Sequence, residues 1–208
     1  MNWTDIFCGV PLIAILRGLT VSEARPIGEA LVDAGFRCAE VTFNSPDPLE
    51  CIAILQREFG NELLVGAGTV LSESDVDRVA GHNGRIIISP NVDPVVIRAT
   101  KRHGLISLPA FSTPSEAFAA LEAGADALKL FPAEASNPAA LRAMRAVLPA
   151  TAPIFPVGGI DAASMASWRA AGASGFGIGG SLYKPGRSAG EIRQRAETLI
   201  HAWRALEE

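Results

Sequence analysis

The lysine at position 129 is the residue that most clearly suggests chemistry. It interrupts the short apolar run Ala127-Leu128-Lys129-Leu130-Phe131, which has the length of a buried strand. Because side chains alternate along a strand, Leu128 and Leu130 share one face and Lys129 lies on the other. Burial favours the neutral amine, which can attack a carbonyl carbon and form a Schiff base. The alternative is a lysine that reaches solvent or neutralises a buried acid.

A glutamate interrupts a second apolar run in the same way. Glu40 lies within Cys38-Ala39-Glu40-Val41-Thr42-Phe43, on the same face as Cys38 and Thr42. An inward-pointing Glu40 would meet an inward-pointing Lys129. Imine formation and carbon–carbon cleavage both require a group beside the lysine that gives and takes protons. A structural ion pair is the alternative interpretation of the same two residues.

Two glycine-rich segments follow the last two apolar runs. They are Val157-Gly158-Gly159-Ile160 and Gly177-Ile178-Gly179-Gly180-Ser181. Backbone without side chains lets N–H groups approach an anion, and barrel enzymes bind phosphate after their seventh and eighth strands. One such segment alone would indicate only a turn. The pair predicts a phosphate site formed by Gly158, Gly159, Gly179, Gly180 and Ser181.

Two further segments could contact a ligand. Arg17 follows the first apolar run in phase with Ile13 and Ile15, and would supply a cation for a phosphate or a carboxylate. A solvated loop arginine is the alternative. The third run ends in Gly68-Thr69, where small side chains would let a ligand reach backbone N–H groups and a hydroxyl. A bulge or tight packing is the alternative explanation of these residues.

The elements that must position these residues form a repeating pattern. Short apolar runs alternate with segments of helical periodicity, which predicts a single (β/α)8 TIM barrel over residues 1–208. An open doubly wound sheet is the alternative, but no Gly-x-Gly-x-x-Gly turn follows the first run. In a barrel, the candidate residues would share the carboxyl-terminal ends of the strands. The expected strands are Leu12–Leu16, Cys38–Phe43, Leu63–Thr69, Arg85–Ser89, Leu105–Ala110, Ala127–Phe131, Pro153–Val157 and Gly175–Gly179.

Residues typical of helix ends separate these runs. We expect helices to begin after a side-chain cap and to end at a glycine, and we expect the amphipathic stretch 189–208 to pack on the barrel. The expected caps are Thr20, Ser72, Asp93, Thr113 and Asp161, and the expected closing glycines are Gly35, Gly84, Gly104, Gly124 and Gly172.

Composition excludes several classes of protein. The chain has 208 residues, 49% of them apolar and 19% charged, with a formal charge of -4, so neither disorder nor nucleic-acid binding is expected. The segment 1–17 lacks the features of a signal peptide, and no apolar run is long enough to span a membrane. The cysteines Cys8, Cys38 and Cys51 show no disulfide framework, which predicts a reducing, cytoplasmic location. We expect no metal and no cofactor, because no residue cluster has metal-ligand spacing, and no catalytic role for His82, His103 or His201.

The chain resembles the class I aldolases that cleave 2-dehydro-3-deoxy-6-phospho sugar acids. The resemblance spans nearly the whole sequence and is carried by motifs around Arg17, Glu40, Thr69, Lys129 and the first glycine pair. It implies that Lys129 forms the Schiff base, that Glu40 is the general acid/base and that Thr69 contacts the pyruvate portion. It also implies that the second glycine pair with Ser181 completes the phosphate cradle, that Arg17 assists anion binding, and that the enzyme is a homotrimer acting on a phosphorylated sugar acid. The motifs are Leu12-Ile13-Ala14-Ile15-Leu16-Arg17-Gly18, Ala39-Glu40-Val41-Thr42-Phe43-Asn44-Ser45-Pro46, Val65-Gly66-Ala67-Gly68-Thr69-Val70-Leu71, Ala127-Leu128-Lys129-Leu130-Phe131-Pro132 and Val157-Gly158-Gly159-Ile160.

Two departures from the family pattern indicate a subgroup. Members that act on the gluconate-derived substrate usually carry arginine and threonine where this chain has Asn44 and Val157. These two residues resemble the galactonate-derived subgroup, which acts in galactonate catabolism and whose substrate is the C4 epimer. The gluconate-derived epimer remains the alternative substrate. A phosphosugar isomerase or epimerase, or a non-catalytic phospholigand-binding barrel, would share the glycine loops but would not require Lys129.

Overall fold

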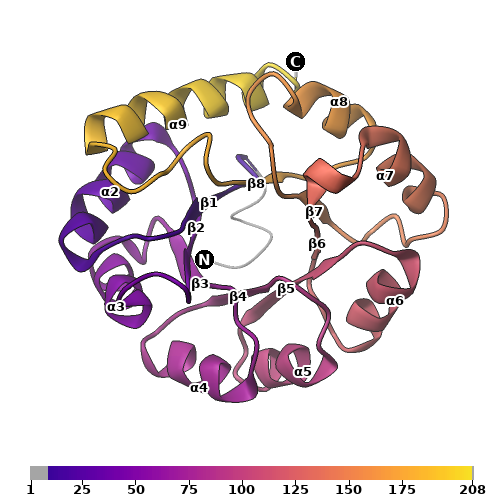
Figure 1. Cartoon of the computed structure of the whole chain (residues 1–208), viewed down its shortest axis with the longest axis horizontal. Coiled ribbons are helices and arrows are strands. Elements are labelled where there is room, and N and C mark those ends of the chain that lie inside the picture. The colour runs from indigo at the N-terminus through magenta and orange to yellow at the C-terminus, as the bar shows by residue number, and fades with distance from the viewer. Residues whose placement is uncertain (1–8, 208) are drawn as a thin grey trace.

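The computed structural model describes residues 9–207, and Figure 1 shows a ring of strands surrounded by helices. Cys8 and the first eight residues of the segment 1–17 lie outside the described residues, so the expectations for them stay predictions. Each predicted strand is present, and its ends differ from the prediction by no more than one residue. The strands are β1 (Leu12–Leu16), β2 (Cys38–Thr42), β3 (Leu64–Gly68), β4 (Ile86–Ser89), β5 (Ile106–Phe111), β6 (Leu128–Leu130), β7 (Ile154–Pro156) and β8 (Phe176–Ile178).

The strands form one parallel barrel. Their order is β7-β6-β5-β4-β3-β2-β1-β8, and all pairs are parallel. The ring closes between β7 and β8 through a single parallel bridge from Val157 to Gly177. The predicted (β/α)8 TIM barrel is therefore confirmed, and the carboxyl-terminal ends of all eight strands lie at one rim.

Helices cover the outside of the barrel (Figure 1). Four of the expected caps, Thr20, Ser72, Asp93 and Thr113, precede the first residue of a helix. The helices are α2 (Val21–Ala34), α3 (Pro48–Phe59), α4 (Glu73–Gly81), α5 (Pro94–Arg102), α6 (Pro114–Glu122), α7 (Pro138–Arg145), α8 (Met165–Ala170) and α9 (Ala189–Arg204), with a 3-10 turn η1 (Ala133–Ala135) after β6. Within residues 9–207, no helix is both long and apolar enough to cross a bilayer.

Two of the expected helix ends are different in the structure. Asp161 does not cap α8; its carboxylate accepts a hydrogen bond from the Ser164 N–H at 2.9 Å, and the helix begins one residue later. After α4, Asn83 rather than Gly84 adopts the left-handed conformation, with φ of 61°. Gly84 is needed for space, because a Cβ there would lie 2.3 Å from Cγ1 of Val79.

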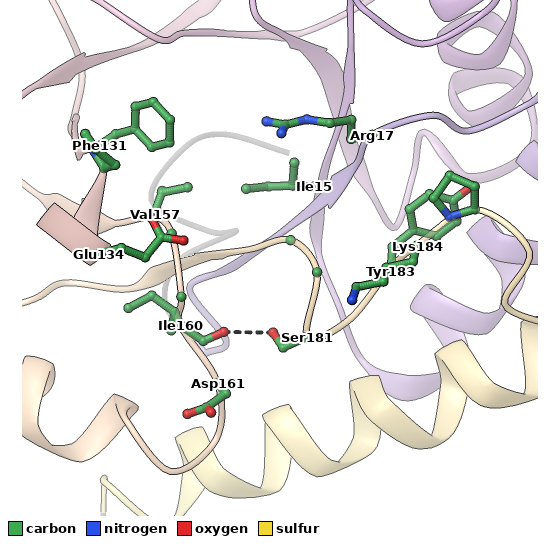
Figure 2. Close-up of a pocket in the computed structure, with 16 residues that line it drawn as sticks. Ile15, Arg17, Phe131, Glu134, Val157, Ile160, Asp161, Ser181, Tyr183 and Lys184 are labelled. Atoms are coloured by element: carbon green, nitrogen blue, oxygen red, sulfur yellow. Dashed lines mark hydrogen bonds between the residues drawn. The ribbon is translucent and has the colours of Figure 1, made fainter.

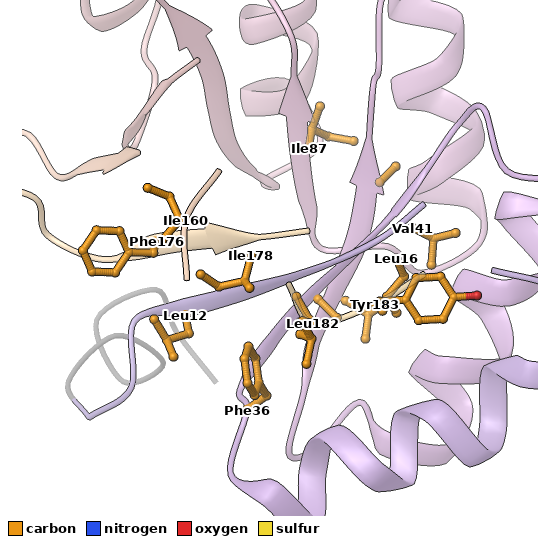
Figure 3. Packing of buried hydrophobic residues seen from close by; sticks show 14 of the residues in the cluster. Leu12, Leu16, Phe36, Val41, Ile87, Ile160, Phe176, Ile178, Leu182 and Tyr183 are labelled. Atoms are coloured by element: carbon orange, nitrogen blue, oxygen red, sulfur yellow. The ribbon is translucent and has the colours of Figure 1, made fainter. Parts of the chain in front are cut away.

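Two apolar layers fix which way each strand faces. The outer layer lies between strands and helices and includes Leu128 and Leu130. Figure 3 shows another part of this layer, with Val41 and Leu16. A separate cluster contains the side chains of the opposite parity, which fill the barrel: Ile13, Cys38, Leu64, Ile86, Ile88, Leu108, Ala127 and Phe155. A one-residue shift of β6 would turn its two leucines away from the helices and turn Lys129 toward them. Each leucine that lost its burial would cost about 1.5 to 3 kcal/mol in the free energy of folding.

The carboxyl-terminal helix completes this outer layer. Helix α9 buries Ile192, Ala196, Leu199, Ile200 and Trp203, and Figure 1 shows it beside α2. The indole N–H of Trp203 donates to the carbonyl of Gly9 at 3.2 Å, so the helix also holds the segment that leads into β1. The expected packing of this stretch on the barrel is confirmed.

Candidate active site

Lys129 lies inside the barrel, as the alternation predicted. Its neighbour at the same parity, Ala127, belongs to the inner cluster, and only 7% of Lys129 is exposed. The Nζ atom lies 4.9 Å from the centroid of the Phe131 ring. Within residues 9–207, no carboxylate forms an ion pair with this ammonium group and no acceptor forms a hydrogen bond with it. Strand β6 therefore holds a buried amine that forms no ion pair or hydrogen bond with the described chain, and whose charge acts on Glu40 from a longer distance.

Glu40 also points into the barrel, from β2. The residue is 1% exposed, and its Oε2 atom is buried with no hydrogen-bond partner among the described residues. Burial raises the pKa of this carboxyl group, and the positive charges of Lys129 and Arg17 partly offset that effect. A carboxyl group with a raised pKa can both donate and accept a proton closer to neutral pH. Glu40 thus has the properties of a general acid/base with one oxygen free to act.

Gly68 is the last residue of β3 and lies against Glu40, and Thr69 follows it. A Cβ atom at Gly68 would lie 2.5 Å from Glu40 Oε2, so any larger residue would displace the carboxylate. Gly68 is thus tightly packed against Glu40, and its contact with a ligand stays a prediction. Thr69 has φ of 59°, a conformation that costs a β-branched residue free energy and that often marks functional sites.

A cavity of about 620 Å³ opens at the carboxyl-terminal rim of the barrel (Figure 2). Its lining includes seven of the predicted ligand-binding residues: Arg17, Val157, Gly158, Gly159, Gly179, Gly180 and Ser181. Glu40, Lys129, Gly68 and Thr69 are not among its lining residues, and Asn44 is an exposed residue after β2 that does not line it either. Phe131 connects the two regions, because it lines the cavity and its ring contacts the Lys129 ammonium group.

The segment that carries Arg17 is fixed by hydrogen bonds from the loop after β2. The hydroxyl of the buried Ser45 accepts from the Gly18 N–H at 2.9 Å and donates to the Leu16 carbonyl at 3.4 Å. It also shares a hydrogen bond with the Thr42 hydroxyl at 3.3 Å. The guanidinium group of Arg17 is thereby held where it lowers the pKa of Glu40 and borders the cavity.

The cavity is also lined by three charged residues that were not predicted to bind a ligand, although Asp161 was predicted as a helix cap. Glu134 from η1 and Asp161 after β7 bring carboxylates to its wall, and Lys184 after β8 brings an amine. Glu134 packs closely on the first glycine pair, since a Cβ at Gly158 would lie against its Oε2 atom. All three residues follow strand ends, so considering every charged residue between a strand end and the next helix as a possible ligand contact would have included them.

The remaining predictions concern metals, thiols and histidines. Across residues 9–207, no group of three or more His, Cys, Asp or Glu side chains is placed to hold a metal ion. Cys38 and Cys51 are buried and free, and burial raises the pKa of Cys51 to about 11. His82 and His103 follow the last residues of α4 and α5, at the rim opposite the cavity.

Comparison with known proteins gives consistent matches over nearly the whole chain. The family model "Aldolase: KDPG and KHG aldolase" matches residues 5–194. A probable 2-dehydro-3-deoxy-6-phosphogalactonate aldolase from Rhizobium meliloti (strain 1021) is 46% identical over 94% of this chain and 92% of its own. The 2-dehydro-3-deoxy-6-phosphogalactonate aldolase of Escherichia coli (strain K12) is 42% identical, over 94% and 95%. A solved structure described as native KDPGal superposes with a TM-score of 0.95 at 40% identity, covering 100% of this chain and 99% of the other.

Proposed function

The chain belongs to the KDPG and KHG aldolase family, and from this premise we propose that it cleaves 2-dehydro-3-deoxy-6-phospho-D-galactonate to pyruvate and D-glyceraldehyde 3-phosphate. It is a carbon–carbon lyase of the class I type. The observation that carries the proposed chemistry is the pair of buried groups inside the barrel, a Lys129 without an ion pair or hydrogen bond and a Glu40 whose Oε2 has no hydrogen-bond partner in the described chain. The names of the two relatives support the choice of substrate.

The proposed mechanism uses Lys129 as nucleophile. Its neutral amine attacks the C2 ketone, and loss of water gives an iminium ion that withdraws electrons from C3. The C3–C4 bond then breaks as the C4 hydroxyl loses its proton, which releases D-glyceraldehyde 3-phosphate and leaves an enamine on the lysine. Protonation of the enamine at C3 and hydrolysis of the imine release pyruvate and restore the amine. Glu40 transfers the protons in these steps, because its Oε2 is free and its pKa is raised.

The rest of the substrate would extend from the barrel into the rim cavity. The N–H groups of Gly180 and Ser181 have no acceptor within the described chain, which suits them to a phosphate, and Gly158, Gly159 and Gly179 border the same space. The positive charge of Arg17 would attract the acid or phosphate groups of the substrate. Thr69, which follows Gly68 in the chain, would contact the pyruvate portion.

The apolar Val157 supports preference for the galactonate-derived epimer. It lines the cavity next to the first glycine pair and offers no hydrogen bond to a C4 hydroxyl directed at it. An unpaired polar group costs about 1 to 3 kcal/mol, which is enough to discriminate between C4 epimers. Asn44 lies on the surface outside the cavity, so Val157 carries the geometric part of this argument. This preference would place the enzyme in galactonate catabolism.

We also propose that the enzyme is a cytoplasmic homotrimer. Large apolar side chains at Leu71, Val95 and Phe118 are about half exposed on three consecutive βα segments, as expected of a surface that another subunit covers. The free thiols of Cys38 and Cys51 suit a reducing compartment. Light scattering that gave the mass of a monomer would contradict the trimer.

The test of the proposed function is release of pyruvate from the two C4 epimers. The pyruvate formed would be measured with lactate dehydrogenase, and we expect the higher kcat/KM for the galactonate-derived substrate. A preference for the gluconate-derived epimer would overturn the choice of substrate but not the reaction. Binding or isomerisation of the sugar acids without pyruvate release would overturn the reaction itself.

A further inference from the structure

Lys184 is an exposed lysine on the wall of the cavity, in the segment after β8. Its alkyl chain folds back over the glycine loop, because its Cε atom is only 3.4 Å from a Cβ built at Gly180. Figure 2 shows Lys184 on the opposite wall from Glu134. Within residues 9–207, its ammonium group has neither an ion pair nor a hydrogen bond. The amine therefore lies beside the unpaired N–H groups of the predicted phosphate cradle.

The backbone around Lys184 is held in place, unlike that of a typical surface loop. The preceding Tyr183 is buried, and its hydroxyl donates to Oε2 of Glu23 on α2 at 3.4 Å. The guanidinium group of Arg187 donates to the carbonyls of Gly180 and Leu182 at 3.0 and 2.8 Å. These contacts fix the segment on both sides of Lys184, so its side chain starts from a defined position.

The following residue connects this segment to the loop that bears Arg17. A Cβ built at Gly18 would lie 2.8 Å from Cγ of Pro185, so the two loops pack directly against each other. Gly18 in turn donates to the Ser45 hydroxyl. Lys184 and Arg17 thus reach the cavity from two loops that pack against each other.

The charges on the cavity wall require a second cation if a phosphate binds there. Glu134 and Asp161 are carboxylates, and hydrogen bonds from the Ser164 backbone and hydroxyl lower the pKa of Asp161, so that it is ionised at neutral pH. Arg17 alone would leave the wall with a net negative charge toward a phosphate dianion. With Lys184 included, the formal charges of these four groups sum to zero. Because the amine has no ion-pair or hydrogen-bond partner in the described chain, a bound phosphate could contact it directly.

We propose that Lys184 is a substrate-binding residue that contacts the phosphate group and sets the preference for phosphorylated over unphosphorylated substrates. This inference rests on the proposed function and extends it to a residue outside the glycine motifs. Because the amine is exposed, its interaction with phosphate would be weakened by salt.

The first test compares two acceptor aldehydes in the reverse, carbon–carbon bond-forming direction. Pyruvate would be added to D-glyceraldehyde 3-phosphate or to D-glyceraldehyde by the wild type, Lys184→Met and Lys184→Arg. We expect Lys184→Met to lose about 10- to 100-fold in kcat/KM with the phosphorylated aldehyde and less than about threefold with the other. Lys184→Arg, which keeps the charge, should recover most of the activity with the phosphorylated aldehyde.

Two controls separate phosphate binding from a structural role. Arg142→Met removes one positive charge from the exposed side of α7, outside the cavity, and should not change the ratio between the two aldehydes. Exchange of the pyruvate methyl protons with solvent deuterium reports on Lys129 and Glu40 alone, and should be the same in Lys184→Met as in wild type. An equal loss with both aldehydes, or no loss with the phosphorylated one, would overturn the role of Lys184.

The second test needs no turnover and is independent of the proposed reaction. Inorganic phosphate would be titrated into the wild type and into Lys184→Met, with binding followed by calorimetry at low salt. We expect Lys184→Met to bind phosphate about 10-fold more weakly or worse, with Arg142→Met unchanged. Equal phosphate affinity of wild type and Lys184→Met would contradict the inference even if the aldolase reaction were established. Failure of pyruvate exchange in the wild type would instead count against the proposed function.

Discussion

Replacing Gly68 by alanine tests whether the position of the Glu40 carboxylate controls the rate. The added Cβ would lie 2.5 Å from Oε2, 2.6 Å from Cδ and 2.9 Å from Oε1 of Glu40. Ordinary van der Waals contact begins near 3.4 Å, so the carboxylate must move by roughly 0.9 Å, the difference between 3.4 and 2.5 Å. A displacement of about 1 Å in a reacting group costs roughly 100-fold in rate. We therefore expect kcat of Gly68→Ala to fall by about that factor.

The same substitution should affect stability much less than rate. The atoms that must move belong to the end of a flexible side chain, and Gly68 is not among the residues with positive φ. We expect a loss of about 1 kcal/mol or less in the free energy of unfolding, measured by urea denaturation. Gly81→Ala is the matched control, because a Cβ there has no neighbour within 4 Å, and it should keep wild-type kcat.

A double-mutant cycle shows whether the rate loss acts through Glu40. In a Glu40→Gln background the proton-transfer group is already disabled, so Gly68→Ala should lower kcat by less than about threefold. The assay is pyruvate release under saturating substrate. Wild-type kcat in Gly68→Ala, or an undiminished 100-fold loss in the double variant, would refute the link between this glycine and the carboxylate.

Three other predictions follow from the site. Glu40→Gln should slow turnover by roughly 10²- to 10⁴-fold. It should also make the protein more stable at pH 8, by about 1 to 3 kcal/mol. The raised pKa of Glu40 means that its contribution to stability is full below the unfolded pKa of about 4.3 and is lost as pH rises through the folded value. The difference in free energy of unfolding between Glu40→Gln and the wild type should therefore vanish in urea titrations below pH 4. A difference that did not depend on pH would show that the ionisation of Glu40 is not its cause. Val157→Thr should raise kcat/KM for the gluconate-derived epimer about tenfold relative to the other, the equivalent of about 1.4 kcal/mol, and an unchanged ratio would remove Val157 from substrate selection. Treatment with EDTA should leave pyruvate release intact, because the iminium ion is the electron sink; activity that fell and returned with added divalent metal would contradict this scheme.

The barrel and the direction of its inner side chains could be predicted because they depend on short-range alternation. Leu128 and Leu130 determine the face of Lys129, and a slip of one residue would remove the leucines from the outer layer. The same reasoning placed Glu40 correctly. These inferences needed no knowledge of which strands were neighbours, only that each strand had one face toward the helices.

Contacts between loops could not be predicted in this way. Nothing in the local sequence indicates that Ser45 bonds to the loop of Gly18, or that Pro185 packs on the same glycine. The direction of Lys184 depends on these contacts, because a loop has no periodicity from which a side-chain direction follows. Asp161 was predicted wrongly for a different reason. Its side chain is suited to capping a helix, but it accepts a hydrogen bond within the turn before α8, and Ser164 is the residue that precedes the helix.

The most direct test of the account is reductive trapping of the Schiff base. The protein would be treated with pyruvate and borohydride, digested, and its peptides analysed by mass spectrometry. The chain has three lysines, Lys101, Lys129 and Lys184, so the modified residue can be assigned without ambiguity. We predict a pyruvate adduct on Lys129 alone and none in Lys129→Met. Absence of an adduct on the wild type, or an adduct on another lysine with activity retained in Lys129→Met, would contradict the central claim.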